Sequence, residues 1–499
     1  MIPFLIYSLV FLLLIYYNGF FGLFKDEQIN PAQYTLLLLG KILAVPVFYV
    51  TYKQLYGGIQ NFDTGKFYND VQVITHFAKT DPGFYFRLIF GLQDDAPGSY
   101  DFENCLKYTL NWDNGTVKDY LYNDNRVVIR IHTLLDFLTF GSYLTHSLFN
   151  CFLSFVGIHF LYKSFKDQFS GKEIGVLLIL CFFPALWFYT GALLKEGLCL
   201  FVMGCSAFQI KQLSERRYGW KRFLFMVALL YLSFLLKPYL LLFFILCFGL
   251  YFFIQRSTVV TRKIGMYLAI IAGFVIIANT LSLALKKRSF VTAVLEHQRR
   301  FEAVSKGGVF LTDSLNYMQL KPDTTLIKRT SKKNWVTIRP GVPYMYWEPN
   351  RPLDTLYCLS NEDTLSSYQL IYFIPQSGSN ILLNKTNALT LILSSWYYSL
   401  MHPFFLHTKN SLQKLASLEN FLVLISLLIT FWGLLGGKKD NFLPVVFLFF
   451  SLTLSLVIGL SAPNSGAIFR YRAPALIFVV MAALYFLDLS NFRRRGIDP

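Results

Sequence analysis

Residues 443–460 have the sequence LPVVFLFFSLTLSLVIGL, which contains no charged side chain. An apolar stretch of about 18 residues is long enough to cross a lipid bilayer as an α-helix. The other predicted spans are similarly apolar and comprise residues 2–24, 34–51, 144–162, 174–189, 193–210, 223–236, 239–254, 264–285, 421–435 and 473–489. The sequence therefore predicts an all-α, polytopic integral membrane protein with about eleven transmembrane helices.

The composition of the chain supports this class. Hydrophobic residues make up 54% of the sequence, aromatic residues 18% and charged residues only 15%, whereas soluble domains carry about 25% charged residues. The formal net charge of +17 would suggest nucleic acid in a soluble protein, but the basic residues here recur in short clusters between apolar runs. We therefore exclude a nucleic-acid partner and expect membrane lipids as the surroundings.

The basic clusters also predict how the chain is oriented in the membrane. Every second short connection is rich in lysine or arginine, namely residues 163–172, 211–222, 256–263 and 438–439, followed by the tail at 493–495. Short basic connections face the cytoplasm. We therefore expect a cytoplasmic C-terminus, with the two long loops and the N-terminus on the outer side.

The apolar runs and long loops divide the chain into five parts. They are residues 1–52 with two spans, 53–143 as the first external loop, 144–285 with six spans, 286–420 as the second external loop, and 421–499 with three spans and a basic cytoplasmic tail. Four apolar pieces of the loops, 84–92, 127–140, 289–304 and 388–400, are expected to lie along the membrane surface as helices or to dock against the membrane helices. The Pro-rich stretch 339–352 should interrupt helical structure.

Cysteine usage leaves two alternatives open. Five of the seven cysteines fall within or beside apolar spans, where cysteine behaves as a small hydrophobic residue. Cys105 and Cys358 fall one in each external loop. An oxidising exterior would allow a disulfide between them, but two unpaired thiols fit the sequence as well.

The first external loop opens with an acidic segment, residues 61–70, NFDTGKFYND. Asp63 and Asp70 are seven positions apart, so on a helix they lie about two turns apart along one face, with Tyr68 between them. An enzyme that acts on a membrane-anchored substrate would keep its general base in such a place. Alternatively, the carboxylates are solvated loop residues with a helix-capping role.

Several charged residues are predicted at the outer ends of membrane helices. They are Lys195 and Glu196 in a short connection, Lys237 before a proline, and Arg470 and Arg472 ahead of the last span. Each could extend to the membrane surface by itself. Together they predict a cationic pocket beside the acidic loop, suited to a phosphate or pyrophosphate.

Three short motifs carry a resemblance to known proteins. The run Asp63 to Tyr68, the segment that contains Tyr189-Thr-Gly and Lys195-Glu196, and Arg470-Tyr-Arg472-x-Pro474 look like bacterial polytopic glycosyltransferases of the GT-C type and the related surface-polysaccharide polymerases. The resemblance implies a sugar transferred from a polyprenyl-phosphate donor to a glycan, lipid or protein acceptor on the outer face of the bacterial inner membrane. In that family the acidic loop follows the first span, whereas here it follows the second.

The resulting hypothesis gives Asp63, or Asp70 in another register, the role of the base that deprotonates the acceptor hydroxyl. Arg470, Arg472 and Lys195 would stabilise the departing lipid phosphate. The other candidate substrate-binding residues are Tyr68, Glu196, Lys237 and His402. The sequence contains none of the nucleotide or zinc motifs sought, and neither a metal nor a soluble cofactor is expected.

Three other functions remain open. A polymerase would use the same groups together with arginines of the second loop, Arg299 and Arg300. A transporter or flippase of an anionic lipid-linked molecule would need the cationic pocket but no acidic loop. A non-catalytic scaffold of the cell envelope is the third alternative.

Overall fold

The computed structural model describes most of the helical chain and parts of the second long loop. The described residues are 1–19, 21–58, 62–94, 99–112, 124–217, 219–255, 259–286, 307–312, 317–321, 327–329, 335–338, 343–346, 357–358, 367–374, 388–404, 411–436, 440–462 and 464–488. The expected helix at 289–304, with Arg299 and Arg300, and the basic tail at 493–495 lie outside them.

The chain is predominantly helical, as expected. The helices are α1 (Ile2–Asn18), α2 (Pro31–Ile42), α3 (Ala44–Tyr56), α4 (Asp63–Thr80), α5 (Pro82–Phe90), α6 (Tyr100–Asn104), α7 (Asp124–Thr139), α8 (Tyr143–Phe165), α9 (Glu173–Phe182), α10 (Pro184–Thr190), α11 (Lys195–Ser214), α12 (Trp220–Leu236), α13 (Pro238–Ile254), α14 (Val260–Lys286), α16 (Ala388–Trp396), α17 (Ser411–Leu435), α18 (Phe442–Ser461) and α19 (Ser465–Phe486). Short turns of 3₁₀-helix, η2 (Leu106–Tyr108) and η3 (Lys166–Gln168), and of π-helix, η6 (Tyr397–Met401), complete the set.

Within the described residues, six helices are long and apolar enough to cross a membrane: Pro31–Leu55, Tyr143–Gln168, Val260–Leu281, Gln413–Leu435, Phe442–Ser461 and Ser465–Phe486. The pair α9 and α10, bent by 58°, is a seventh if it forms one span. Membrane helices are thus supported, but the number eleven is not confirmed. One reason is that α1 ends early, where Gly19 adopts a left-handed conformation (φ +51°) that caps the helix.

A very close contact between membrane helices joins α8 and α11. A Cβ atom added to Gly204 would lie 1.8 Å from the backbone oxygen of Gly157, so the two backbones touch directly. Small residues at such interfaces let apolar helices approach closely. Aromatic rings fill the neighbouring interior, where Phe248 and Phe478 have ring centroids 5.0 Å apart and Phe447 and Phe478 5.2 Å apart.

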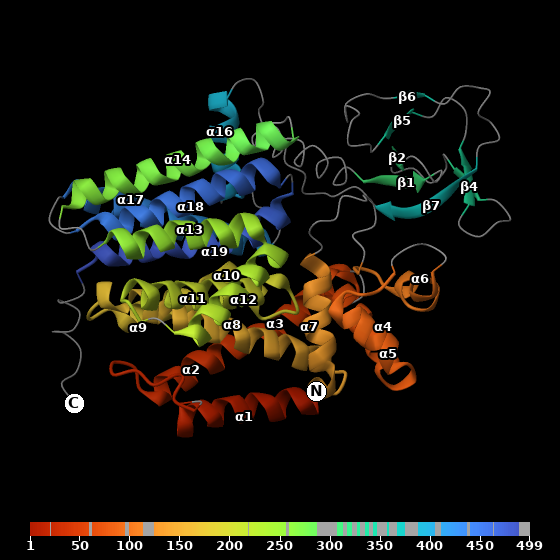
Figure 1. The fold of residues 1–499 in the computed structure, drawn as a ribbon, viewed down its shortest axis with the longest axis horizontal. Helices are drawn as coiled ribbons and strands as arrows, with labels where there is room; N and C mark the ends of the chain where they lie inside the picture. Colours follow the sequence, from red (N-terminus) through yellow and green to blue (C-terminus); the bar gives the residue numbers. More distant parts are fainter. Residues whose placement is uncertain are drawn as a thin grey trace.

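Figure 1 shows that the long helices run side by side and that α4, α5, α6 and a β-sheet lie beyond one end of them. The N-terminus of α1 lies at this end too. Parts of both long loops therefore lie at the same end of the helical bundle, whereas α16 packs alongside α18, where Trp396 donates to the carbonyl of Leu452 at 2.9 Å. Which side faces the cytoplasm remains a prediction.

The sheet was not predicted, because the second loop was expected to contain only helices and irregular chain. Its strands are β1 (Gly308–Thr312), β2 (Tyr317–Leu320), β3 (Ile327–Arg329), β4 (Trp335–Ile338), β5 (Pro343–Tyr346), β6 (Tyr357–Cys358) and β7 (Ser367–Ile374). They form one antiparallel sheet in the order β3-β4-β7-β1-β2-β5-β6. In β4, Val336 and Ile338 are buried on either side of the half-buried Thr337, which is the two-residue period of a strand.

Other expectations for the loops have mixed outcomes. Three of the apolar loop pieces are helices, α5, α7 and α16, although their contact with a membrane surface is still a prediction. Residues 339–352 are not helical where described and include β5. Cys105 is a buried free thiol, so of the two alternatives for this residue the structure has the unpaired thiol.

Candidate functional site

The first functional element is the start of α4, which begins at Asp63 itself. Phe62 is extended at the cap position, and Asp63 occupies the first turn, where the helix dipole favours a negative charge. The hydroxyl group of Thr64 forms a hydrogen bond of 2.8 Å with the hydroxyl group of Tyr143, which belongs to α8. The Tyr68 hydroxyl donates to the carbonyl of Gly141 at 2.5 Å. These contacts fix the start of α4 against the membrane helices. The hydroxyl group of Tyr68, a predicted substrate-binding residue, is used in this structural contact.

Asp70 has a different environment from Asp63. Its side chain is fully buried and accepts hydrogen bonds from the backbone N–H groups of Leu110 at 2.6 Å and Asn111 at 2.7 Å. Burial raises the pKa of Asp70 to about 6, against the opposing effect of these hydrogen bonds. Both carboxylates lie on α4 as predicted, but Asp70 anchors the following loop to the helix. The Asp63 side chain is 56% exposed.

The second element is the connection between α10 and α11, which positions Glu196. The Asn150 side chain of α8 donates to the carbonyls of Ala192 at 2.6 Å and Leu194 at 2.9 Å, and so holds this turn in place. A Cβ atom at Gly197 would lie 2.6 Å from Asn150 Nδ2. Glycine is therefore required after Glu196 if α11 is to begin this close to α8.

Four charged residues meet between these elements, and we call Asp63, Glu196, Lys237 and Arg470 the charge cluster. Arg470 of α19 joins the two carboxylates, with Nη1 3.1 Å from Asp63 Oδ2 and Nε 2.7 Å from Glu196 Oε1. Lys237 Nζ lies 2.8 Å from the same Glu196 oxygen. The cluster contains two acids and two bases, so its formal charges balance. It runs from the buried Glu196, 2% exposed, to the exposed Asp63.

Other groups add polarity to the charge cluster. The second carboxylate oxygen of Glu196, Oε2, is buried and makes no hydrogen bond within the described part of the chain. Lys237 lies 4.3 Å from the ring centre of Tyr471, and the largely buried Lys195 lies 6.0 Å from the ring centre of Phe67 on α4. Lys195 thus brings a further positive charge to the surroundings of α4 and α11. Guanidinium and ammonium groups at this density suit an anionic ligand such as a phosphate.

Arg472 does not join this cluster, contrary to the prediction of a single cationic pocket. It is fully buried, and its Nη2 lies 3.5 Å from Glu419 Oε1 and hydrogen bonds to Asn420. Residues two positions apart on an α-helix point about 200° apart, so Arg470 and Arg472 face different neighbours. The guanidinium of Arg472 also donates to the carbonyls of Ser399 at 2.8 Å and His402 at 3.4 Å.

The neighbours of Arg472 show why it has a structural role. Glu419 also accepts the backbone N–H of Ala185 at 2.7 Å, so one ion pair joins α10, α17, α19 and η6. The carbonyl oxygen of His402 accepts a hydrogen bond from Arg472. The centroids of the His402 and Tyr398 rings are 5.4 Å apart. Glu419 was not among the predicted site residues, although a carboxylate just before an apolar span usually has a charged or polar partner.

A second polar group lies behind α4 and was also missed. His146 Nε2 of α8 is 2.8 Å from Asp136 Oδ1 of α7, and Gln72 of α4 donates to the same oxygen at 2.9 Å. The Nδ1 atoms of His146 and His132 are 3.2 Å apart. These contacts hold α4, α7 and α8 together. Gln72 is 64 positions from Asp136 in the sequence, so no local pattern could have paired these two residues.

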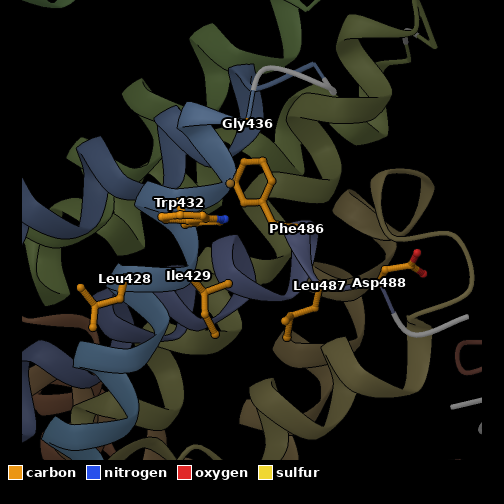
Figure 2. A pocket seen from close by; sticks show the side chains of 8 residues that line it. Leu428, Ile429, Trp432, Gly436, Phe486, Leu487 and Asp488 are labelled. Carbon is orange, nitrogen blue, oxygen red and sulfur yellow. The ribbon is translucent and has the colours of Figure 1, made fainter. Parts of the chain in front are cut away.

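The structure also has a surface groove, shown in Figure 2, at the far end of α19. Its volume is about 780 Å³, and its walls are mainly apolar, formed by α17 and the end of α19: Leu428, Ile429, Trp432, Gly433, Gly436, Phe486, Leu487 and Asp488. Phe486 is about 24 Å along the helix axis from Arg470, at 1.5 Å per residue. The groove is therefore separate from the charge cluster.

The described residues include no group of three His, Cys, Asp or Glu side chains arranged to hold a metal ion. Comparison of the chain with protein-family models, with characterised proteins and with solved structures found no match. Any conclusion about function therefore rests on the charge cluster and its surroundings.

Proposed function

We propose that this protein is a membrane glycosyltransferase that transfers a sugar from a polyprenyl-phosphate donor to an acceptor hydroxyl. The observation that carries the proposal is the position of Arg470 between an exposed and a buried carboxylate, at the end of the helical bundle where the polar loops gather. An anion-binding group and an accessible carboxylate, held next to each other beside membrane helices, are the two parts that such a transfer needs.

In the proposed reaction, the acceptor oxygen attacks the anomeric carbon of the donor sugar. The bond between that carbon and the phosphate oxygen breaks, the polyprenyl phosphate or pyrophosphate leaves with the bonding electrons, and the acceptor proton passes to Asp63. Arg470, Lys237 and Lys195 supply positive charge for the leaving phosphate. Asp70 is assigned no chemical step, because both of its oxygens accept backbone hydrogen bonds.

The surroundings support a lipid-linked substrate. Exposed apolar side chains cover the outer surface of several helices, for example Phe274, Val275 and Ile277 on α14, as in helices that face lipid. A donor with a prenyl chain would stay in the membrane and present its phosphate at the end of the helices. We place the reaction on the outer face of a bacterial inner membrane, in the assembly of a cell-surface glycan. En bloc polymerisation of such a glycan would need the same groups.

The proposal is tested by transfer from radiolabelled polyprenyl-phosphate sugars, using the full-length protein in lipid nanodiscs. Asp63→Asn keeps the size of the side chain but removes its basicity, so the transfer rate should fall about a hundredfold or more. Glu103→Gln is the matched control, because Glu103 pairs with Lys107 in the exposed part of the same loop. Full transfer by the Asp63→Asn protein would refute the catalytic assignment.

A transporter of an anionic lipid-linked molecule is the second candidate, and one observation favours it. The helices α9 and α10 are bent by 58°, and broken helices line the substrate sites of many transporters. The fully buried Lys41 donates to Thr190 at the end of α10, at 2.7 Å. Movement of a fluorescent polyprenyl phosphate between the leaflets of proteoliposomes, without sugar transfer, would support this alternative.

A further inference from the structure

Asp63 and Arg470 are joined across 407 positions of sequence, and the two ends of their ion pair differ in exposure. The Asp63 side chain is 56% exposed, whereas that of Arg470 is 15% exposed. An ion pair with one partner in water contributes little to stability and is readily exchanged. The Asp63 side of the pair is therefore the side that can open.

Arg470 is held in place independently of Asp63. Its Nε donates to the buried Glu196 at 2.7 Å, and Lys237 binds the same carboxylate oxygen at 2.8 Å. The guanidinium also lies 5.5 Å from the ring centre of Tyr471. If Asp63 moved away, Arg470 would keep its position and present Nη1 to a new partner. The planar N–H groups of arginine match the oxygen atoms of a phosphate.

The ion pair also limits what Asp63 can do. While Arg470 Nη1 donates to Oδ2 of Asp63, that oxygen is occupied and is turned toward α19. Asp63 begins α4, and its side chain is directed by the contacts that fix the first turn of that helix. Release of the side chain from Arg470 therefore requires only a rotation about its own bonds, while α4 stays in place.

We infer that Asp63 and the phosphate of the lipid-linked donor compete for Arg470, so that donor binding releases the carboxylate that acts as base. This inference rests on the proposed function and adds an order of events to it. Without the donor, Asp63 is paired and the site is closed to acceptor chemistry. With the donor bound, the phosphate takes Arg470 and Asp63 becomes free to accept the proton of the acceptor hydroxyl.

The inference is tested by binding, without any sugar transfer, using farnesyl phosphate as the probe and the full-length protein in nanodiscs. Asp63→Asn removes the competing charge and should bind the probe about threefold to fivefold more tightly than the unmodified protein. Arg470→Gln should bind it about tenfold more weakly. Arg470→Lys keeps the charge but loses the planar fork. Its affinity for the probe should therefore lie between that of the unmodified protein and that of Arg470→Gln.

Two controls make the result specific. Glu103→Gln removes one negative charge from the same loop, so it should leave probe affinity unchanged if general electrostatics are not responsible. In the double variant Asp63→Asn with Arg470→Gln, the gain from the first substitution should disappear, because the two residues act on one contact. Each variant is first checked for its elution volume and melting temperature.

The outcomes separate the inference from the proposed function. Equal or weaker probe binding by Asp63→Asn would overturn the competition. Tighter binding by Asp63→Asn, together with no sugar transfer by the unmodified protein from any donor, would retain the competition at a phosphate site and refute the transferase. Tighter binding that persists in the double variant would show that Arg470 is not the shared partner, and would refute the inference.

Discussion

Arg470 and Arg472 are separated by one residue of α19, yet their guanidinium groups bind different carboxylates, Asp63 and Glu196 in one case and Glu419 in the other. The helical rotation between them sends one side chain to the partly open charge cluster and the other into the closed interior. Substitutions at the two positions should therefore affect different properties of the protein.

The first prediction concerns the buried pair of Arg472 and Glu419. Arg472→Gln should destabilise the fold by about 3–5 kcal/mol, because it leaves Glu419 buried without its partner. The free energy of unfolding can be measured by titration with a denaturing detergent. The double variant Arg472→Met with Glu419→Leu should recover part of the loss. A single variant as stable as the unmodified protein would disprove the structural role.

Close packing of α8 on α11 gives the second prediction. Gly204→Ala would place a Cβ atom 1.8 Å from the backbone oxygen of Gly157, and should cost about 2 kcal/mol or more through separation of the helices. Gly249→Ala is the matched control, because a Cβ atom there meets nothing within 4 Å. It should be neutral or stabilising by up to about 1 kcal/mol. Equal melting temperatures for the two variants would contradict the direct backbone contact.

A third prediction concerns pH and the link between α1 and α2. Burial acts to raise the pKa of Asp26, but hydrogen bonds from Lys166 at 2.9 Å and from the Gln28 N–H outweigh it, so this pKa lies below the ordinary value of 3.8. A depressed carboxyl pKa stabilises the fold above the pKa of the unfolded chain, and the contribution disappears as the pH falls through the folded value.

Asp26→Asn should therefore lower stability at pH 7 by about 1 kcal/mol. The difference from the unmodified protein should vanish below the ordinary carboxyl range. Melting temperatures of both proteins between pH 7 and pH 2.5 measure this. A difference that stays constant with pH would mean that the ionised pair is not its cause.

The fourth prediction concerns the thiol of Cys105, which is buried and free. Burial raises its pKa to about 12, so the reactive thiolate is scarce at neutral pH. Cys105 should resist alkylation in the native protein under non-reducing conditions and react fully once the protein is unfolded. Mass spectrometry of the labelled peptides measures both states. A peptide containing Cys105 disulfide-linked to Cys358 would contradict the structure.

The sequence alone was sufficient for the helical, membrane-spanning character of the chain. Apolar runs such as residues 443–460 fix this locally, because the hydrogen bonds of a helix close within the run and its side chains suit a lipid environment. For the acidic segment at Asp63 the sequence left a helix and a solvated loop open, and the structure has the helix. The sheet left no comparable local signal, because its strands are short, β1 (GVFLT) does not alternate apolar and polar residues, and β1 and β4 pair with the distant β7.

Only the tertiary structure decided which of the charged residues meet. Asp63 and Arg470 lie in helices at opposite ends of the sequence, and Glu196 reaches them only because Asn150 and Gly197 seat the start of α11 against α8. From the sequence alone, Asp70 was a candidate site residue like Asp63, and Arg472 like Arg470. In the folded protein, Asp70 and Arg472 are buried and bind structural partners instead. Burial and ion pairing depend on the arrangement of all the helices, and no local stretch of sequence contains that information.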